Sequence, residues 1–217
     1  MLYSDLKANI MAILNRRDAT PSQINTFCGL AIQRIQRTLR VPAMETSTAV
    51  TMDGISNLVP VPGDFLELID LTFNDNTNQR KLIRTDHQSA IRLSNLPGTP
   101  TSFYRDKGNF LLGPKPAQGS ICVISYYQDA SDLMADTDHN WITDSTPDLL
   151  IYGALSYAAD FFLDERKQGF EDRYNQIFSD TQLMALQDDL MGAWISPAYS
   201  DNPSAYYPYA NGSYPFS

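Results

Sequence analysis

The sequence holds few of the residues from which metal, disulfide or catalytic sites are built. Its 217 residues include two cysteines and two histidines. Cys28 and Cys122 form no CxxC pair, so they provide neither a disulfide framework nor a cysteine-ligated zinc site. We expect them to be two small buried residues in a reducing cytoplasm. His87 and His139 lie in polar segments without a nearby Cys or His, and we expect solvated or hydrogen-bonded loop histidines.

The short sequence signatures of enzymes are absent as well. No glycine-rich phosphate loop, GxSxG nucleophile elbow or HExxH metal pair occurs. Sequence alone gives no way to select an Asp/Glu pair for glycoside cleavage among the many carboxylates of the C-terminal half. We therefore predict that the protein is not an enzyme and that it needs no cofactor and no metal.

The sequence also lacks a run suited to a membrane span or a secretion leader. The most apolar window, Leu149–Leu163, is interrupted by Asp160 and is too short to cross a bilayer. The first seven residues show no positively charged stretch followed by an apolar block. We expect synthesis in the cytosol and no membrane partner.

Charge is distributed unevenly along the chain. The net charge of -9 argues against general nucleic-acid affinity. Residues 1–45 carry six basic and three acidic side chains, and residues 46–128 carry seven of each. Residues 129–195 carry fourteen acidic and three basic side chains, whereas residues 196–217 carry Asp201 alone. The C-terminal half is therefore the acidic one.

Two amphipathic helices are predicted before residue 46. Apolar residues at helical spacing predict the first over residues 3–15. The second begins with Thr20 as N-cap, Pro21 at the first helical position and Gln23 as the partner in a capping box. Pro42 ends it. Its apolar stripe consists of Ile24, Phe27, Cys28, Ala31, Ile35 and Leu39.

From residue 46 to residue 127 the pattern changes to short β-like runs separated by turn residues. Asp53-Gly54 and Lys107-Gly108-Asn109 are predicted hairpin tips. Ile121–Tyr127 is apolar on both faces, which predicts a central position in a sheet. A half-buried strand is indicated by alternating apolar residues at Ile69, Leu71 and Phe73.

Helix is predicted again in the acidic part. Thr146-Pro147-Asp148 supplies an N-cap, a first-turn proline and an acidic residue that complements the helix dipole, so a helix should run to about Leu163. A further helix spans about Glu165–Leu190. One face of this helix carries Phe170, Tyr174, Ile177, Phe178 and Thr181.

These patterns predict an α+β fold with a four-helix bundle-like core. Residues 1–45 and 129–195 form that helical core, and residues 46–128 form an inserted β-rich subdomain. Residues 196–217 form an extended C-terminal arm, because their prolines disfavour helix. Large aromatic side chains that stay in water lose the free energy they would gain on burial. We therefore predict that the arm docks on another protein surface. Its anchors would be Tyr199, Tyr206, Tyr207, Tyr209, Tyr214 and Phe216.

A basic strip is predicted on the second helix. Arg34, Arg37 and Arg40 lie at spacing three on its polar side. One interpretation is a solvated helix face that contributes little to folding. The other is a subunit interface, in which these guanidinium groups meet carboxylates of the acidic C-terminal helices of the next copy. The opposite charges of the two parts of the chain agree with the second.

Several motifs occur in a fixed order over about residues 3–190. They are Ala31–Glu45, Val61–Leu68, Gly98–Tyr104, Leu111–Pro116, Ile124–Tyr127, Asn140-Trp141 and Pro147–Leu155, the last followed by Ala158, Ala159, Phe161 and Asp164. In this order they resemble the second helix, PxDFLEL segment, GxPxxY turn, paired strands and third helix of the head-to-tail adaptor (connector) proteins of short-tailed and related bacteriophages.

This resemblance implies a structural virion protein at the head-tail junction. Such adaptors form a ring of copies, commonly a dodecamer, that docks beneath the portal protein and offers a platform to a tail or nozzle protein. DNA passes through the lumen during ejection without sequence-specific contact. The protein would be made in the bacterial host cytoplasm, and its aromatic arm would dock on the portal or on a neighbouring copy.

Two other functions remain open at this point. One is a different tail-completion or nozzle ring protein, which would share the helices and strands and differ in its partner. The other is a virion-associated cell-wall hydrolase that uses an Asp/Glu pair, which requires a carboxylate-dependent activity.

Overall fold

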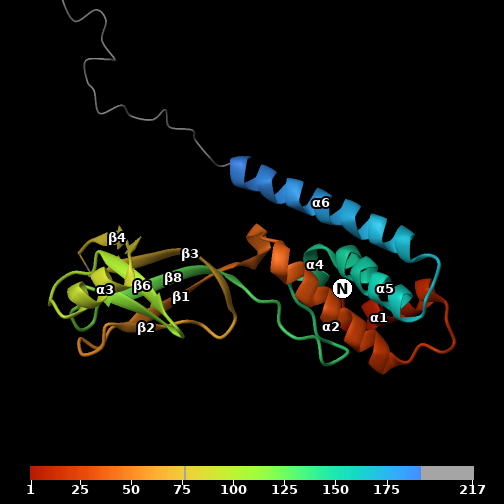
Figure 1. The fold of residues 1–217 in the computed structure, drawn as a ribbon, viewed down its shortest axis with the longest axis horizontal. Coiled ribbons are helices and arrows are strands. Elements are labelled where there is room, and N and C mark those ends of the chain that lie inside the picture. Colours follow the sequence, from red (N-terminus) through yellow and green to blue (C-terminus); the bar gives the residue numbers. More distant parts are fainter. Residues whose placement is uncertain (76, 192–217) are drawn as a thin grey trace, which may run out of the picture.

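The computed structural model of the chain describes residues 1–75 and 77–191. Over these residues the chain is mixed α+β, with six α-helices and two four-stranded sheets. The α+β prediction is therefore confirmed. Figure 1 shows an elongated molecule with the sheets gathered at one end and most of the helices at the other.

The helical end is arranged around one helix. It consists of α1 (Tyr3–Leu14), α2 (Pro21–Thr38), α4 (Trp141–Ser145), α5 (Pro147–Phe161) and α6 (Lys167–Met191). α5 packs against the other four and is buried on most of its surface. Gly153 of α5 permits the close approach of α2 and α6, because a Cβ there would lie 3.1 Å from Cβ of Ala31 and 3.3 Å from the ring of Tyr174.

The predicted start of α2 is confirmed. The Thr20 hydroxyl accepts a hydrogen bond from the Gln23 N–H at 3.4 Å, and the Gln23 side chain accepts one from the Thr20 N–H at 2.8 Å. These two bonds form the predicted capping box, which satisfies N–H groups that have no partner within the helix. All six residues of the predicted apolar stripe are buried.

The prediction of a Thr146 N-cap for α5 is wrong in its detail. Thr146 does precede α5, but its side chain makes no capping hydrogen bond, and its Oγ1 is buried without a partner among the described residues. The reason is that Thr146 also ends α4, with its N–H donating to the Ile142 carbonyl. Its ψ of 59° is consequently not the extended conformation of a capping residue.

The sheet end contains two four-stranded sheets. The first has the order β1 (Glu45–Thr51), β8 (Ile121–Gln128), β3 (Phe65–Asn74) and β4 (Gln79–Lys81). The second has the order β2 (Leu58–Pro60), β7 (Asn109–Gly113), β6 (Ser102–Asp106) and β5 (Ile83–Arg84). β8 lies between β1 and β3, which confirms its predicted central position. The helix α3 (His87–Ser94), capped by Asp86, was not predicted because its apolar pattern is short.

One of the two predicted hairpin tips is correct. Lys107-Gly108 joins β6 to β7, with Asp106 opposite Asn109. Asp53-Gly54 is not a hairpin tip, because β1 pairs with β8 and β2 pairs with β7. It is a turn between the two sheets, in which the Asp53 carboxylate accepts hydrogen bonds from two following N–H groups.

The predicted alternation along β3 holds only at its end. Leu71 and Phe73 are buried, whereas Ile69 is 39% exposed. The pairing of β3 with β8 shifts register between Leu68 and Asp70, and such a bulge changes which side chains face the core.

Each end of the molecule is stabilised by its own hydrophobic cluster. The helical cluster extends over α1, α2, α5 and α6, and includes Met44 at the end of a short 3-10 helix, η1 (Pro42–Met44). The second cluster lies between the sheets around Leu71, Phe103 and Phe110. Each end therefore has its own core.

Candidate subunit interface

The three arginines of the predicted strip have different surroundings. Arg34 binds Glu171 of α6 through both terminal guanidinium nitrogens, and its guanidinium lies 4.0 Å from the ring centre of Tyr174. Arg40 lies beyond the end of α2 and pairs with Glu67 of β3 at 2.8 Å. Arg37 is exposed, and its Nε donates to the Gln33 carbonyl at 3.2 Å. The structure thus brings Arg34 and Arg37 together at one groove and separates Arg40 from them.

Arg34 connects helices of the subunit through Glu171. The Ser156 hydroxyl of α5 donates to the same Glu171 carboxylate at 2.5 Å, so three helices meet at this group. The hydrogen bonds from Arg34, with help from Ser156, hold the pKa of Glu171 below its ordinary value although partial burial opposes them. Arg34 and Glu171 lie 137 residues apart, which explains why the sequence pattern could not reveal the pair.

Arg37 lies on the edge of a groove between α2 and α6. The groove has a volume of about 350 Å³. Its lining residues are Arg34, Arg37, Thr38, Tyr174, Asn175 and Phe178, and we call it the basic groove. The rings of Tyr174 and Phe178 stack at a centroid distance of 6.0 Å and form its aromatic floor. No carboxylate among the described residues forms an ion pair with Arg37.

A second groove, of about 360 Å³, lies on the other flank of α2. It separates the helix from residues 129–134, which we call the acidic loop. Asp129 and Asp132 of this loop are exposed, and neither forms an ion pair with a described Lys or Arg. Partial burial and the carboxylates of Asp132 and Asp64 raise the pKa of Asp129. The prediction did not single out this loop, because a coil has no periodicity to mark it.

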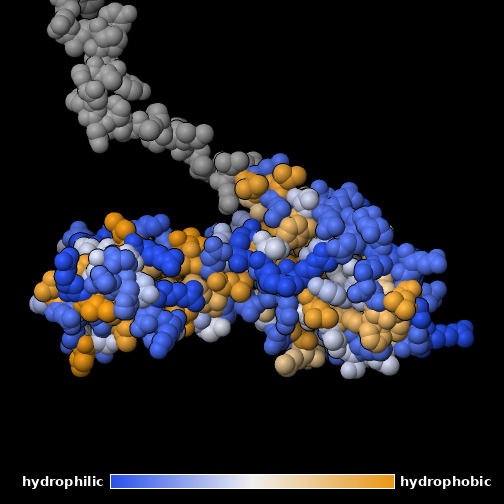
Figure 2. All heavy atoms as spheres, in the orientation of Figure 1, coloured by the Kyte–Doolittle hydropathy of each residue, from blue (hydrophilic) through white to orange (hydrophobic). Residues whose placement is uncertain are grey.

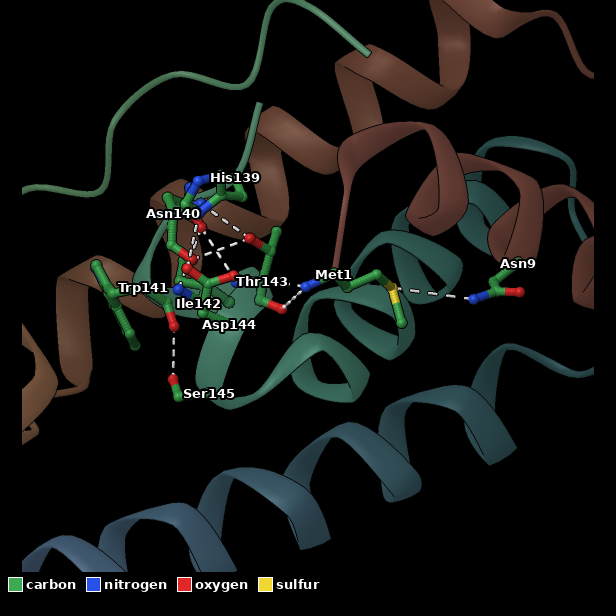
Figure 3. Close-up of polar contacts among 9 residues, drawn as sticks. All are labelled: Met1, Asn9, His139, Asn140, Trp141, Ile142, Thr143, Asp144 and Ser145. Carbon is green, nitrogen blue, oxygen red and sulfur yellow. Dashed lines mark hydrogen bonds and ion pairs between the residues drawn. The ribbon is translucent and has the colours of Figure 1, made fainter. Parts of the chain in front are cut away.

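The acidic loop is hydrogen-bonded to the rest of the chain at its middle and at its end. The Asn140 side chain donates to the Ser131 carbonyl at 3.0 Å, and the Met134 N–H donates to the Asp138 carboxylate at 2.9 Å. Figure 3 shows the neighbouring start of α4, where the Met1 ammonium group donates to the Thr143 carbonyl at 2.9 Å. The bonds at Ser131 and Met134 attach the loop to the segment that leads into α4.

Both cysteines are buried as predicted, and His139 lies in a loop as predicted, whereas His87 is the first residue of α3 and not a loop residue. Nδ1 of His139 lies 2.8 Å from a carboxylate oxygen of Asp144, and the His87 ring lies against Tyr104. Both cysteines are free and buried, and burial raises the pKa of each thiol to about 12. The thiols therefore stay protonated at neutral pH. Within residues 1–75 and 77–191, no group of three His, Cys, Asp or Glu side chains is placed to hold a metal ion.

The predicted docking arm lies outside the described residues. Its anchors Tyr199, Tyr206, Tyr207, Tyr209, Tyr214 and Phe216 therefore stay predictions. The last described turns of α6 expose apolar side chains, with Leu183, Met184 and Leu186 each more than half exposed. Figure 2 shows this hydrophobic patch at the end of α6 from which the chain continues. No helix of the described part is long and apolar enough to cross a membrane.

Comparison with known proteins places this architecture in a family. No curated protein matches the sequence. A family model described as SU10 adaptor protein matches residues 1–201, which include both helical segments and the whole β-rich part. The chain therefore belongs to the SU10 adaptor protein family, a family of phage head-to-tail adaptors.

Proposed function

We propose that the protein is a structural virion component whose copies form a ring beneath the portal protein. The family match over residues 1–201 carries this proposal, since a phage adaptor has a structural role. In the proposal, residues 1–45 and 129–195 form a four-helix bundle-like core, and residues 46–128 form the inserted subdomain. A tail or nozzle protein attaches to the opposite face of the ring.

The charge distribution supports a closed ring. A ring is made by one heterologous interface repeated by rotation, so each copy must carry two different complementary surfaces. The basic groove and the acidic loop are two such surfaces. Acidic side chains that face the lumen would repel DNA from the wall and let it slide, because phosphate contacts to basic residues are what hold DNA.

The test of this proposal is binding to portal protein. Purified adaptor mixed with portal should co-sediment with it in a fixed ratio and should then recruit a tail or nozzle protein. If the adaptor binds tail components and never portal, it is a different tail-completion protein. Cell-wall cleavage that is lost on a single carboxylate substitution would instead support a hydrolase.

The C-terminal arm is proposed to dock the adaptor on the portal or on a neighbouring copy. Extended segments bind by inserting side chains into pockets, and ordering them costs entropy, so several aromatic rings must be buried together. A chain cut after Ile195 should fold but attach poorly to portal. A full-length chain with Tyr206, Tyr207, Tyr209 and Tyr214 changed to Ser should attach as poorly. If portal pulls down the wild type, the truncated chain and the Tyr-to-Ser chain equally, the arm serves another contact.

A further inference from the structure

The two flanks of α2 carry surfaces of opposite charge. An α-helix turns about 100° per residue, so adjacent positions such as Gln36 and Arg37 lie on different sides of it. Arg37 lines the basic groove against α6, and Gln36 lines the groove next to the acidic loop. The two surfaces therefore lie on different flanks of α2, and no ion pair joins Arg37 to Asp129 or Asp132 among the described residues.

The basic groove offers one cation above an aromatic floor. The Arg34 guanidinium is already bound to Glu171, whereas the Arg37 guanidinium donates to the Gln33 carbonyl and has no carboxylate partner within residues 1–75 and 77–191. Tyr174 is buried beneath the Arg34 guanidinium, whereas Phe178 is half-buried, so Phe178 is the ring that a partner can reach. A matching partner must supply a carboxylate and, close to it, an apolar side chain that can lie on aromatic rings.

The acidic loop supplies this combination. Asp132 is exposed without an ion-pair partner among the described residues, and Met134, two residues later, is 81% exposed. A methionine thioether packs favourably on aromatic rings, and Arg binds carboxylates through several donors. The hydrogen bonds from Asn140 and to Asp138 restrain the loop, which lowers the conformational-entropy cost of docking.

We propose that the acidic loop of one copy docks in the basic groove of the next. In this contact Asp132 pairs with Arg37 of the neighbouring copy, and Met134 packs on the half-buried Phe178 of that copy. The contact is heterologous and uses two different flanks of α2, so it can repeat from copy to copy, and it gives the proposed ring when the rotation between copies closes. The inference rests on the proposed ring and names the surfaces that form it.

Charge reversal on full-length protein bound to portal tests the inference. Arg37→Glu and Asp132→Arg should each fold normally, because both side chains are exposed, and each should lose ring assembly. The chain carrying both changes should regain assembly, since the reversed charges again attract across every contact. Met134→Ala should weaken assembly without changing its charge dependence.

Arg92→Glu serves as the matched control, because Arg92 is an exposed arginine on α3 in the β-rich part. It should assemble as the wild type does. Electron microscopy and sedimentation then separate the outcomes. If both single variants still form rings as the wild type does, the inference is overturned and the proposed function stands. Rings lost in both single variants but not regained in the double variant also overturn it. A wild-type protein that never binds portal overturns the proposed function itself.

Discussion

Removing the Arg34 guanidinium should destabilise the subunit. In Arg34→Met, Glu171 keeps the Ser156 hydrogen bond but loses its bidentate partner, while the methionine stem still covers Tyr174. Arg34 and Glu171 are only 26% and 27% exposed, so water compensates the carboxylate incompletely. Loss of hydrogen bonds to a partly buried charge costs about 2 kcal/mol. For a protein of this size that corresponds to a melting temperature lower by about 4–8 °C.

The loss should depend on pH with a defined sign. Arg34 holds the folded-state pKa of Glu171 below the ordinary value of 4.5. A carboxyl with a depressed folded-state pKa contributes stability that is complete above its unfolded-state pKa and is lost as the pH falls through the folded-state value. The difference in unfolding free energy between wild type and Arg34→Met should therefore be largest near neutral pH and should shrink as the pH falls below 4.5.

Thermal and denaturant unfolding across this pH range provide the assay. The control is Arg173→Met, because Arg173 is exposed on α6 and its guanidinium donates to Gln176 of the same helix at 2.9 Å. It should change stability by less than about 0.5 kcal/mol. If Arg34→Met melts with the control at neutral pH, Arg34 belongs to a solvated helix face and the argument from Glu171 is wrong.

Three further changes test other parts of the account. Gly153→Val should lower stability by about 1–3 kcal/mol because its Cβ would press on Ala31 and Tyr174, and an unchanged melting temperature would contradict the close packing. Leu163→Gly should raise stability by roughly 1 kcal/mol, since Leu163 is 89% exposed with a φ of 53° after α5, whereas a lower melting temperature would refute the strain. Ring assembly on portal should weaken as salt rises, because the screening length falls from about 8 Å at physiological ionic strength to about 3 Å at 1 M and exposed ion pairs weaken with it. Rings that persist unchanged at high salt in sedimentation would argue against a charge-dependent contact.

Local signals predicted local structure well. The capping box at Thr20 and Gln23 and the Lys107-Gly108 turn depend on residues within a few positions of each other, and both are present. Asp53-Gly54 has an equally good turn sequence, but strand pairing with β7 and β8, more than fifty residues later, decides what it connects. The bulge beside Ile69 likewise depends on the partner strand.

The candidate interface was only partly predictable for the same reason. Helical spacing placed Arg34 and Arg37 on the polar side of α2. It could not show that Glu171 of α6 binds Arg34 and not Arg37. The net negative charge of residues 129–195 was visible, yet it pointed to the later helices. Tertiary packing sets the coil at Asp129 and Asp132 opposite the basic groove across α2.

The central claim is that the protein forms a ring of copies on the portal, and electron microscopy of the purified adaptor–portal complex tests it most directly. The account predicts a closed ring under the portal with one repeated contact between neighbours, in which the acidic loop of each copy meets α2 and α6 of the next. The resemblance to short-tailed-phage adaptors predicts a dodecamer. A complex with isolated adaptor copies that do not touch, or no complex at all, would contradict the claim.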